Sequence, residues 1–138
     1  MESNLTINRK ILSEPFNVKI KTIESGIEEE VKVNLVETFN IWYGIRVTRI
    51  YTFDDDRKYA FICGIKDNQG LMIIWRSTLN LDYNRDREFI VKILLEEIKI
   101  GINSNRLNQV LINIDETRFV SHPSMNFFAP ISMLIFSG

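Results

Sequence analysis

Acidic residues at two places in the sequence could bind a divalent metal ion. Asp54 and Asp56 belong to a run of three aspartates, and Asp115 and Glu116 follow an apolar segment. Mg²⁺ and Ca²⁺ prefer carboxylate oxygens, so these four residues are the candidate ligands of a small metal-dependent enzyme. Three consecutive carboxylates converge on one ion only in an unusual loop, and no calcium-loop spacing follows them. We therefore favour the alternative interpretation of the aspartate run, a solvated hairpin tip.

A nucleophile and a base are also present, once each. Cys63 is the single cysteine and His122 the single histidine, and a pair of this kind could carry out covalent catalysis. They lie on unrelated predicted elements with no local signature around either, and a zinc site needs more soft ligands. We interpret Cys63 as a small buried residue and His122 as a loop residue, and we expect no cofactor.

Basic, aromatic and small residues alternate in the segment 57–64. Five positions fit the third-strand signature of the RNA-recognition motif, and on them the segment resembles that family: Arg57, Tyr59, Ala60, Phe61 and Ile62. The resemblance implies that Tyr59 and Phe61 stack on RNA bases beside the basic Arg57. Lys58 and Gly64 depart from the signature, and only strands are predicted before it. The alternative is that Tyr59 and Phe61 share one face of a half-buried strand.

The last twenty residues, 119–138, contain no Lys, Arg, Asp or Glu. An exposed terminus normally carries charge, so we expect this segment to be covered, either as a buried strand or as an apolar loop at a protein contact. Trp, Tyr and Arg dominate binding energy in protein interfaces, and two pairs of them elsewhere could extend the same patch. The candidate partner-binding residues are Trp42, Tyr43, Trp75, Arg76, Met125, Phe127 and Phe128.

The elements that must position these residues follow two hydrophobic periods. Before Asn80 the period is two, as in β-strands, and it predicts strands over 17–23, 31–35, 45–53, 59–65 and 71–75. Turns are predicted at 25–26, 54–56 and 67–70. From 84 to 100 the period is helical, with Asp82 or Asn84 as N-cap and Gly101 past the end. Further strands are predicted over 109–114 and 131–136.

These elements predict one α+β domain over residues 1–138. We expect a mainly antiparallel sheet of about six or seven strands, with one long amphipathic helix (about 84–100) packed on one face. One helix is too small to cover so many strands. The sheet must therefore curl strongly or be covered in part by a partner.

Composition sets the class of protein. The chain has 138 residues with 45% hydrophobic and 25% charged residues, and its net charge is −1. These values exclude a disordered or low-complexity chain, and they argue against a nucleic-acid or membrane-surface binder. Isoleucine occurs 21 times and alanine twice, which indicates an AT-rich genome of bacterial, viral or protist origin. No signal peptide or spanning apolar segment is recognised, so we expect a cytoplasmic protein.

The expected function is therefore binding. We expect a small cytoplasmic module that blocks another protein without catalysis, as inhibitors, immunity proteins and phage anti-defence proteins do, and we expect homodimerisation as a companion. The alternative is a small metal-dependent enzyme or a nucleotide- or RNA-handling domain.

Overall fold

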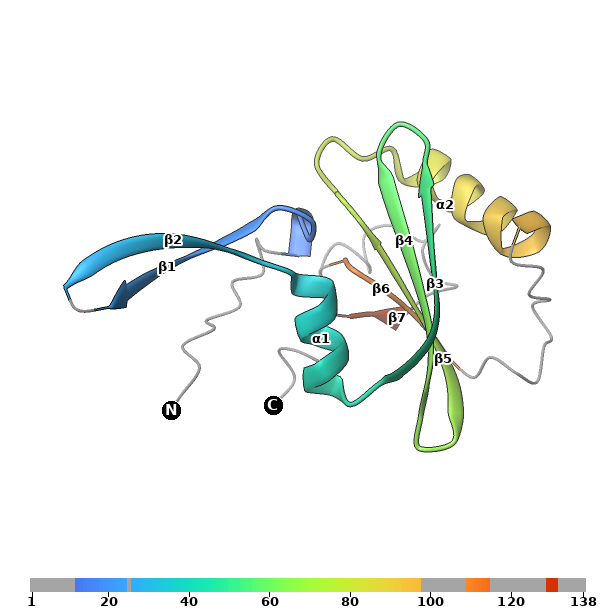
Figure 1. The fold of residues 1–138 in the computed structure, drawn as a ribbon. Helices are drawn as coiled ribbons and strands as arrows, with labels where there is room; N and C mark the ends of the chain where they lie inside the picture. Colours follow the sequence, from blue (N-terminus) through green and yellow to red (C-terminus); the bar gives the residue numbers. More distant parts are fainter. Residues whose placement is uncertain (1–11, 25, 98–108, 115–128, 132–138) are drawn as a thin grey trace.

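The computed structural model describes residues 12–24, 26–97, 109–114 and 129–131, which form an α+β fold (Figure 1). Along the chain the elements are β1 (Val18–Glu24), β2 (Ile27–Val33), α1 (Leu35–Tyr43), β3 (Arg46–Asp54), β4 (Lys58–Lys66), β5 (Gln69–Arg76), α2 (Tyr83–Lys92), a π-helical turn η2 (Ile93–Glu97), β6 (Gln109–Ile112) and β7 (Ala129–Pro130). No helix in these ranges is long and apolar enough to cross a membrane.

The main sheet has five strands in the order β3-β4-β5-β6-β7, and β1 and β2 form a separate antiparallel pair. Strands β3, β4 and β5 are joined by hairpins and are antiparallel, whereas β6 is parallel to β5 and β7 is parallel to β6. The prediction of one mainly antiparallel sheet of six or seven strands is therefore wrong. The reason is the connection through α2, because a crossover returns the chain in the same direction as β5.

The turn between β4 and β5 is confirmed where the sequence predicts it. Asp67 and Asn68 have φ angles of 52° and 63°, between the paired residues Lys66 and Gln69. Positive φ at both central residues is the geometry of a two-residue hairpin turn, which Asp and Asn tolerate. Strand β5 is buried on both faces, as its continuous apolar run predicts.

Helix α1 is not predicted by the sequence analysis, which expects a strand as far as Leu35. Asn34 caps the helix, because its side-chain oxygen accepts a hydrogen bond from the Glu37 backbone N–H at 3.1 Å. Gly44 ends it with a φ of 78°, a conformation that glycine adopts without strain. The buried residues Leu35 and Phe39 are four apart and so share one face.

The second helical segment is confirmed over its described part. Asp82 is the N-cap of α2 and accepts hydrogen bonds from the backbone N–H groups of Asn84 and Arg85. The helix is regular to Lys92 and then widens into η2, which ends at Glu97. Residues 98–100 lie outside the described residues.

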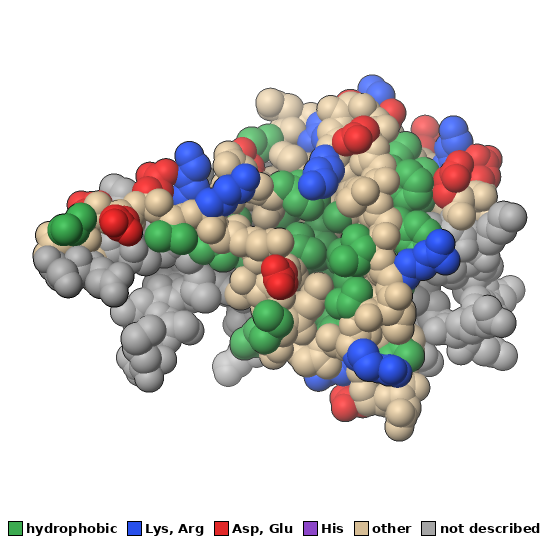
Figure 2. Space-filling view, in the orientation of Figure 1, with side chains coloured by type: hydrophobic (Ala, Val, Ile, Leu, Met, Phe, Trp, Pro, Cys, Tyr) green, Lys and Arg blue, Asp and Glu red, His purple; other side chains and the backbone are tan. Residues whose placement is uncertain are grey.

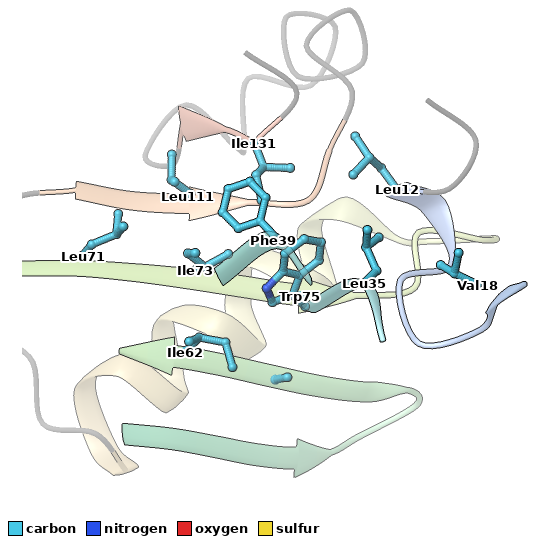
Figure 3. Close-up of a cluster of buried hydrophobic side chains, with 11 residues drawn as sticks. Leu12, Val18, Leu35, Phe39, Ile62, Leu71, Ile73, Trp75, Leu111 and Ile131 are labelled. Atoms are coloured by element: carbon cyan, nitrogen blue, oxygen red, sulfur yellow. The ribbon is translucent and has the colours of Figure 1, made fainter. Parts of the chain in front are cut away.

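Two buried clusters occupy the two faces of the main sheet. The α1-side cluster contains Leu35 and Phe39 together with Ile62, Ile73 and Trp75 of β4 and β5 (Figure 3). The α2-side cluster joins the helical residues Ile90, Ile93 and Leu94 to the other face of the same strands: Tyr59, Phe61, Met72 and Ile74. The expectation of one covering helix is thus wrong, since α1 covers the second face.

Coverage of the sheet is incomplete at its β3 edge. Seven of the nine residues of β3 are exposed, because α1 packs over the central strands. The β1–β2 hairpin projects away from the main sheet (Figure 1), and six of the seven residues of β2 are exposed. Among the described residues, the edge strand β3 and the outer part of the hairpin are therefore the most exposed parts of the two sheets.

Candidate functional site

An open groove of about 750 Å³ lies between α1, the base of the β1–β2 hairpin, the edge strand β3 and its neighbour β4. Figure 2 shows hydrophobic side chains gathered between the hairpin and the β3–β4 strands. Most of the lining is apolar and includes Val36, Ile41, Ile45, Val47, Ile50 and Ile62.

Strand register places the β3 side chains in the groove. Ile50 is paired with Ile62 and Thr52 with Ala60, so all four face the side of the sheet on which α1 lies. Phe39 packs on Trp75 of β5, with ring centroids 5.7 Å apart. The helix is therefore anchored over the centre of the sheet and leaves Ile50 58% exposed.

A β-bulge determines which β3 residues face the groove. The register between β3 and β4 shifts between Val47 and Arg49, and the hydroxyl of Thr48 donates to the Cys63 carbonyl at 3.2 Å. The extra residue reverses the alternation. Val47 and Ile50 consequently face the groove, whereas Tyr51 packs against the α2-side cluster. In the sequence, the alternation of Val47, Tyr51 and Phe53 is broken by Arg49, and the register shift lies at that position.

The groove also has polar features. Asn40 is 8% exposed, and its Oδ1 has no hydrogen-bond partner among the described residues. Lys32, Glu37 and Lys58 lie at the groove, and the Lys58 ammonium is 4.7 Å from the centre of the Phe16 ring. A partner with both apolar and charged side chains would therefore find complementary groups here.

The open edge of β3 runs beside the groove. Within the described strands, β3 pairs with β4 alone, so the N–H and C=O groups on its other side face no strand. The bulge interrupts the strand near Thr48, but the pairing from Ile50 to Asp54 is regular. A regular free edge can accept an additional strand.

Helix α1 carries two of the predicted partner-binding residues, Trp42 and Tyr43, neither of which is among the residues that line the groove. Trp42 is 60% exposed, next to the groove residue Ile41, which is 75% exposed. Tyr43 is half-buried and stacks on Trp42 at 6.2 Å. Phe39 contacts both rings and also Trp75. The structure thus joins three of the predicted aromatic residues through Phe39, which the sequence analysis did not single out.

Trp75 and Arg76 do not lie on the surface. Both are 0% exposed, so the prediction that they contribute to a contact patch does not fit this structure. Alternating residues of β5 face opposite sides of the sheet, and helices cover both sides. Met125, Phe127 and Phe128 lie outside the described residues.

Arg76 is instead the centre of a buried polar network. Its guanidinium binds Asp86 of α2, with Nη2 2.9 Å from Oδ2 and Nε 3.1 Å from the same oxygen. Its Nη1 donates to the carbonyl and side-chain oxygens of Asn113 at 2.9 and 3.0 Å. Tyr59 donates its hydroxyl to Asp86 at 2.8 Å. These contacts fix α2 and the end of β6 against β5, which is a structural role.

The residues of the RNA-binding interpretation are inside the fold or held by it. Tyr59 and Phe61 are 1% and 0% exposed, under α2, and the Tyr59 ring is 4.6 Å from that of Phe89. Base stacking requires an open ring face, which neither ring offers in this structure. Arg57 donates to the carbonyls of Ser77 and Leu79 at 2.7 and 3.0 Å.

The structure describes two of the four acidic candidates, Asp54 and Asp56. Asp54 is exposed at the end of β3, and Asp56 pairs with Arg57 at 3.2 Å. The hydrogen bond from Arg57 lowers the pKa of the Asp56 carboxyl. Asp115 and Glu116 lie outside the described residues. Within the described ranges, no three His, Cys, Asp or Glu side chains come together as a metal site would require.

Cys63 is half-buried on β4, and burial raises the pKa of its thiol. A raised pKa reduces the thiolate fraction at neutral pH and with it nucleophilicity. His122 lies outside the described residues.

The groove and the adjoining edge of β3 are therefore the site that the described residues form most clearly. Comparison of the chain with protein-family models, with curated proteins and with solved structures finds no match.

Proposed function

We propose that this chain is a cytoplasmic protein-binding module and that the groove beside β3 is its contact surface. The observation that carries the proposal is the position of three exposed aliphatic residues in one concave patch. Ile41, Val47 and Ile50 are 75%, 38% and 58% exposed, and all three line the groove. Contiguous exposed apolar surface of this kind is typical of protein contact sites.

The free edge of β3 supports a specific binding mode. An extended segment of the partner adds to β3 between Ile50 and Asp54, where the pairing is regular, and its apolar side chains enter the groove. Main-chain hydrogen bonds then provide affinity, and the pocket residues provide specificity. Trp42, which follows the groove residue Ile41 in the chain and is 60% exposed, is the residue that we expect to contribute most per side chain.

The chemistry of the groove supports function by occlusion. Its apolar residues contact and desolvate a partner, and its charged residues Lys32, Glu37 and Lys58 can pair with charges on that partner. A protein of this kind acts by covering a surface of its partner, as an inhibitor, immunity protein or phage anti-defence protein does.

Affinity capture from nuclease-treated extract of the source organism or its host tests the proposal. The bait is the tagged chain, alone or with Ile50→Asp, and Leu95→Asp is the matched control because Leu95 is 49% exposed on η2, away from the groove. We expect a stoichiometric protein that the parent chain and the control retain and Ile50→Asp loses. Capture of the same proteins by all three baits contradicts the proposal.

A further inference from the structure

The β1–β2 hairpin exposes apolar side chains in the part of the chain that the structure describes. Ile27 and Val31 of β2 are 62% and 42% exposed, and Ile23 of β1 is 77% exposed. An isolated two-stranded hairpin is marginally stable in water unless it packs against other structure. A projecting hairpin with exposed isoleucine and valine is therefore suited to dock on an apolar surface.

We further propose that the β1–β2 hairpin of one copy occupies the groove beside β3 of a second copy, and that the second hairpin does the same in return. The result is a two-fold symmetric dimer with two identical contacts. This inference rests on the proposed function, because it names a second copy of this chain as the protein that the groove binds.

The hairpin matches the groove in strand length and in the apolar side chains that it exposes. Ile27 and Val31 lie on one face of β2 beyond the base of the hairpin, with Glu29 between them on that face. At about 3.4 Å per residue, the seven residues of β2 span about 24 Å and the nine residues of β3 about 31 Å. The part of β2 beyond its base can thus lie along β3 of the second copy, with Ile27 and Val31 toward the apolar residues of the groove.

Charge favours one direction of docking. The tip of the hairpin, residues 24–30, contains four glutamates and no basic residue. The first half of β3 carries the exposed residues Arg46 and Arg49, and Lys66 lies at the neighbouring end of β4. An acidic tip that approaches this basic end gains electrostatic complementarity and a preferred register.

The geometry of the hairpin prevents it from occupying its own groove. Its base is fixed, because Val18 is buried in the α1-side cluster and Val33 packs against that cluster. From this base the hairpin extends away from β3 (Figure 1). A second copy, placed by a two-fold axis, brings the groove to the hairpin without any change of fold.

Light scattering of the purified chain, coupled to size exclusion over a range of concentrations, tests this inference. We expect the parent chain to dimerise, and we expect Val31→Glu in the hairpin and Ile50→Lys in the groove each to weaken the dimer. A central interface residue contributes about 30-fold in affinity, and each substitution occurs twice in the dimer, so the expected rise in Kd is about 1,000-fold. Leu95→Glu is the control and should dimerise like the parent chain.

A mixture of the two variants provides the sharper result. Each variant alone lacks both intact contacts, but the mixture restores one, between the unaltered hairpin of Ile50→Lys and the unaltered groove of Val31→Glu. We therefore expect a one-to-one heterodimer from two monomeric proteins. Circular dichroism of each variant confirms folding, which exposed positions should preserve.

A parent chain that stays monomeric overturns the inference, and so do variants that dimerise as the parent does. If the parent chain is monomeric while Ile50→Asp still abolishes capture of another protein, the proposed function stands and the inference fails. If the mixture fails to associate although the parent chain dimerises, the hairpin does not occupy the groove.

Discussion

Replacement of the buried Arg76 by methionine should lower the free energy of unfolding by about 3–5 kcal/mol. The side chains of Arg76 and Asp86 are both 0% exposed and lie 2.9 Å apart. Methionine has a similar length but no charge, so the Asp86 carboxylate stays in the core with the Tyr59 hydroxyl as its remaining side-chain donor among the described residues. The loss comes mainly from this uncompensated charge rather than from the lost attraction.

The double variant Arg76→Met with Asp86→Leu tests whether the losses of stability in the two single variants are independent. If the two effects were independent, the losses would add to about 6–10 kcal/mol. Removal of both charges leaves two polar groups short of a partner, the Tyr59 hydroxyl and the Asn113 carbonyl, at about 1–3 kcal/mol each. We therefore expect the double variant to be at least as stable as the less stable single variant.

Urea unfolding followed by circular dichroism measures all four proteins of this cycle. A loss below about 1 kcal/mol for Arg76→Met would show that the buried charge is compensated in another way. Additive losses in the double variant would refute the assignment of Arg76 and Asp86 to one network.

Three further predictions concern single residues. Burial, together with the charge of Asp86, raises the pKa of Tyr59; stability should therefore be constant below the unfolded tyrosine pKa of about 10 and fall as the pH rises above it. Urea unfolding at increasing pH should show a smaller fall for Tyr59→Phe, and an equal fall contradicts the buried hydroxyl. Gly64→Ala should lower stability by about 1–3 kcal/mol, because an added Cβ would lie 2.8 Å from the Arg46 carbonyl oxygen; an unchanged melting temperature contradicts the close approach. Acrylamide should quench Trp42, which is 60% exposed, but not Trp75, which is 0% exposed. Trp42→Phe should thus remove the quenchable fluorescence, and strong residual quenching contradicts the burial of Trp75.

Local periodicity was sufficient to predict most of the elements. The alternation over 59–65 and 71–75 predicts β4 and β5, and the helical period predicts α2, because in each case one or both faces are buried against the same core. Helix α1 was missed although its signals are present. Asn34 with Glu37 three residues later, and Gly44 after the last turn, mark its two ends. The alternation of Val31, Val33 and Leu35 favours a strand over the same residues, and the prediction followed it rather than the capping signals.

Residue type alone did not show which candidates are exposed. Trp42 and Trp75 are chemically identical, but one lies on the outer side of α1 and the other on a strand covered on both faces. The sequence does not indicate that Arg76 is buried, because its partner Asp86 is ten residues away. The signal for that partner was the spacing of Asp86, four residues before the buried Ile90 and so on the same face of α2.

The groove itself could not be predicted from the chain. It depends on the bulge at Thr48, which turns Ile50 toward α1, and on the distance between α1 and the edge of the sheet. Both arise from tertiary packing, and a bulge has no reliable sequence signature at a non-glycine position. One predicted helix is nevertheless too small to cover the predicted strands, and this mismatch led to the expectation that a partner covers part of the sheet.

Site-specific photo-crosslinking in cells of the source organism tests the central claim most directly. A photoreactive side chain replaces Ile50 in the groove or, as the control, Leu95 on η2, and mass spectrometry identifies the captured proteins. The proposal predicts a discrete protein adduct from position 50, either a second copy or another chain, and none of that species from position 95. No adduct from position 50, or the same adducts from both positions, would contradict the assignment of the groove as a protein-binding surface.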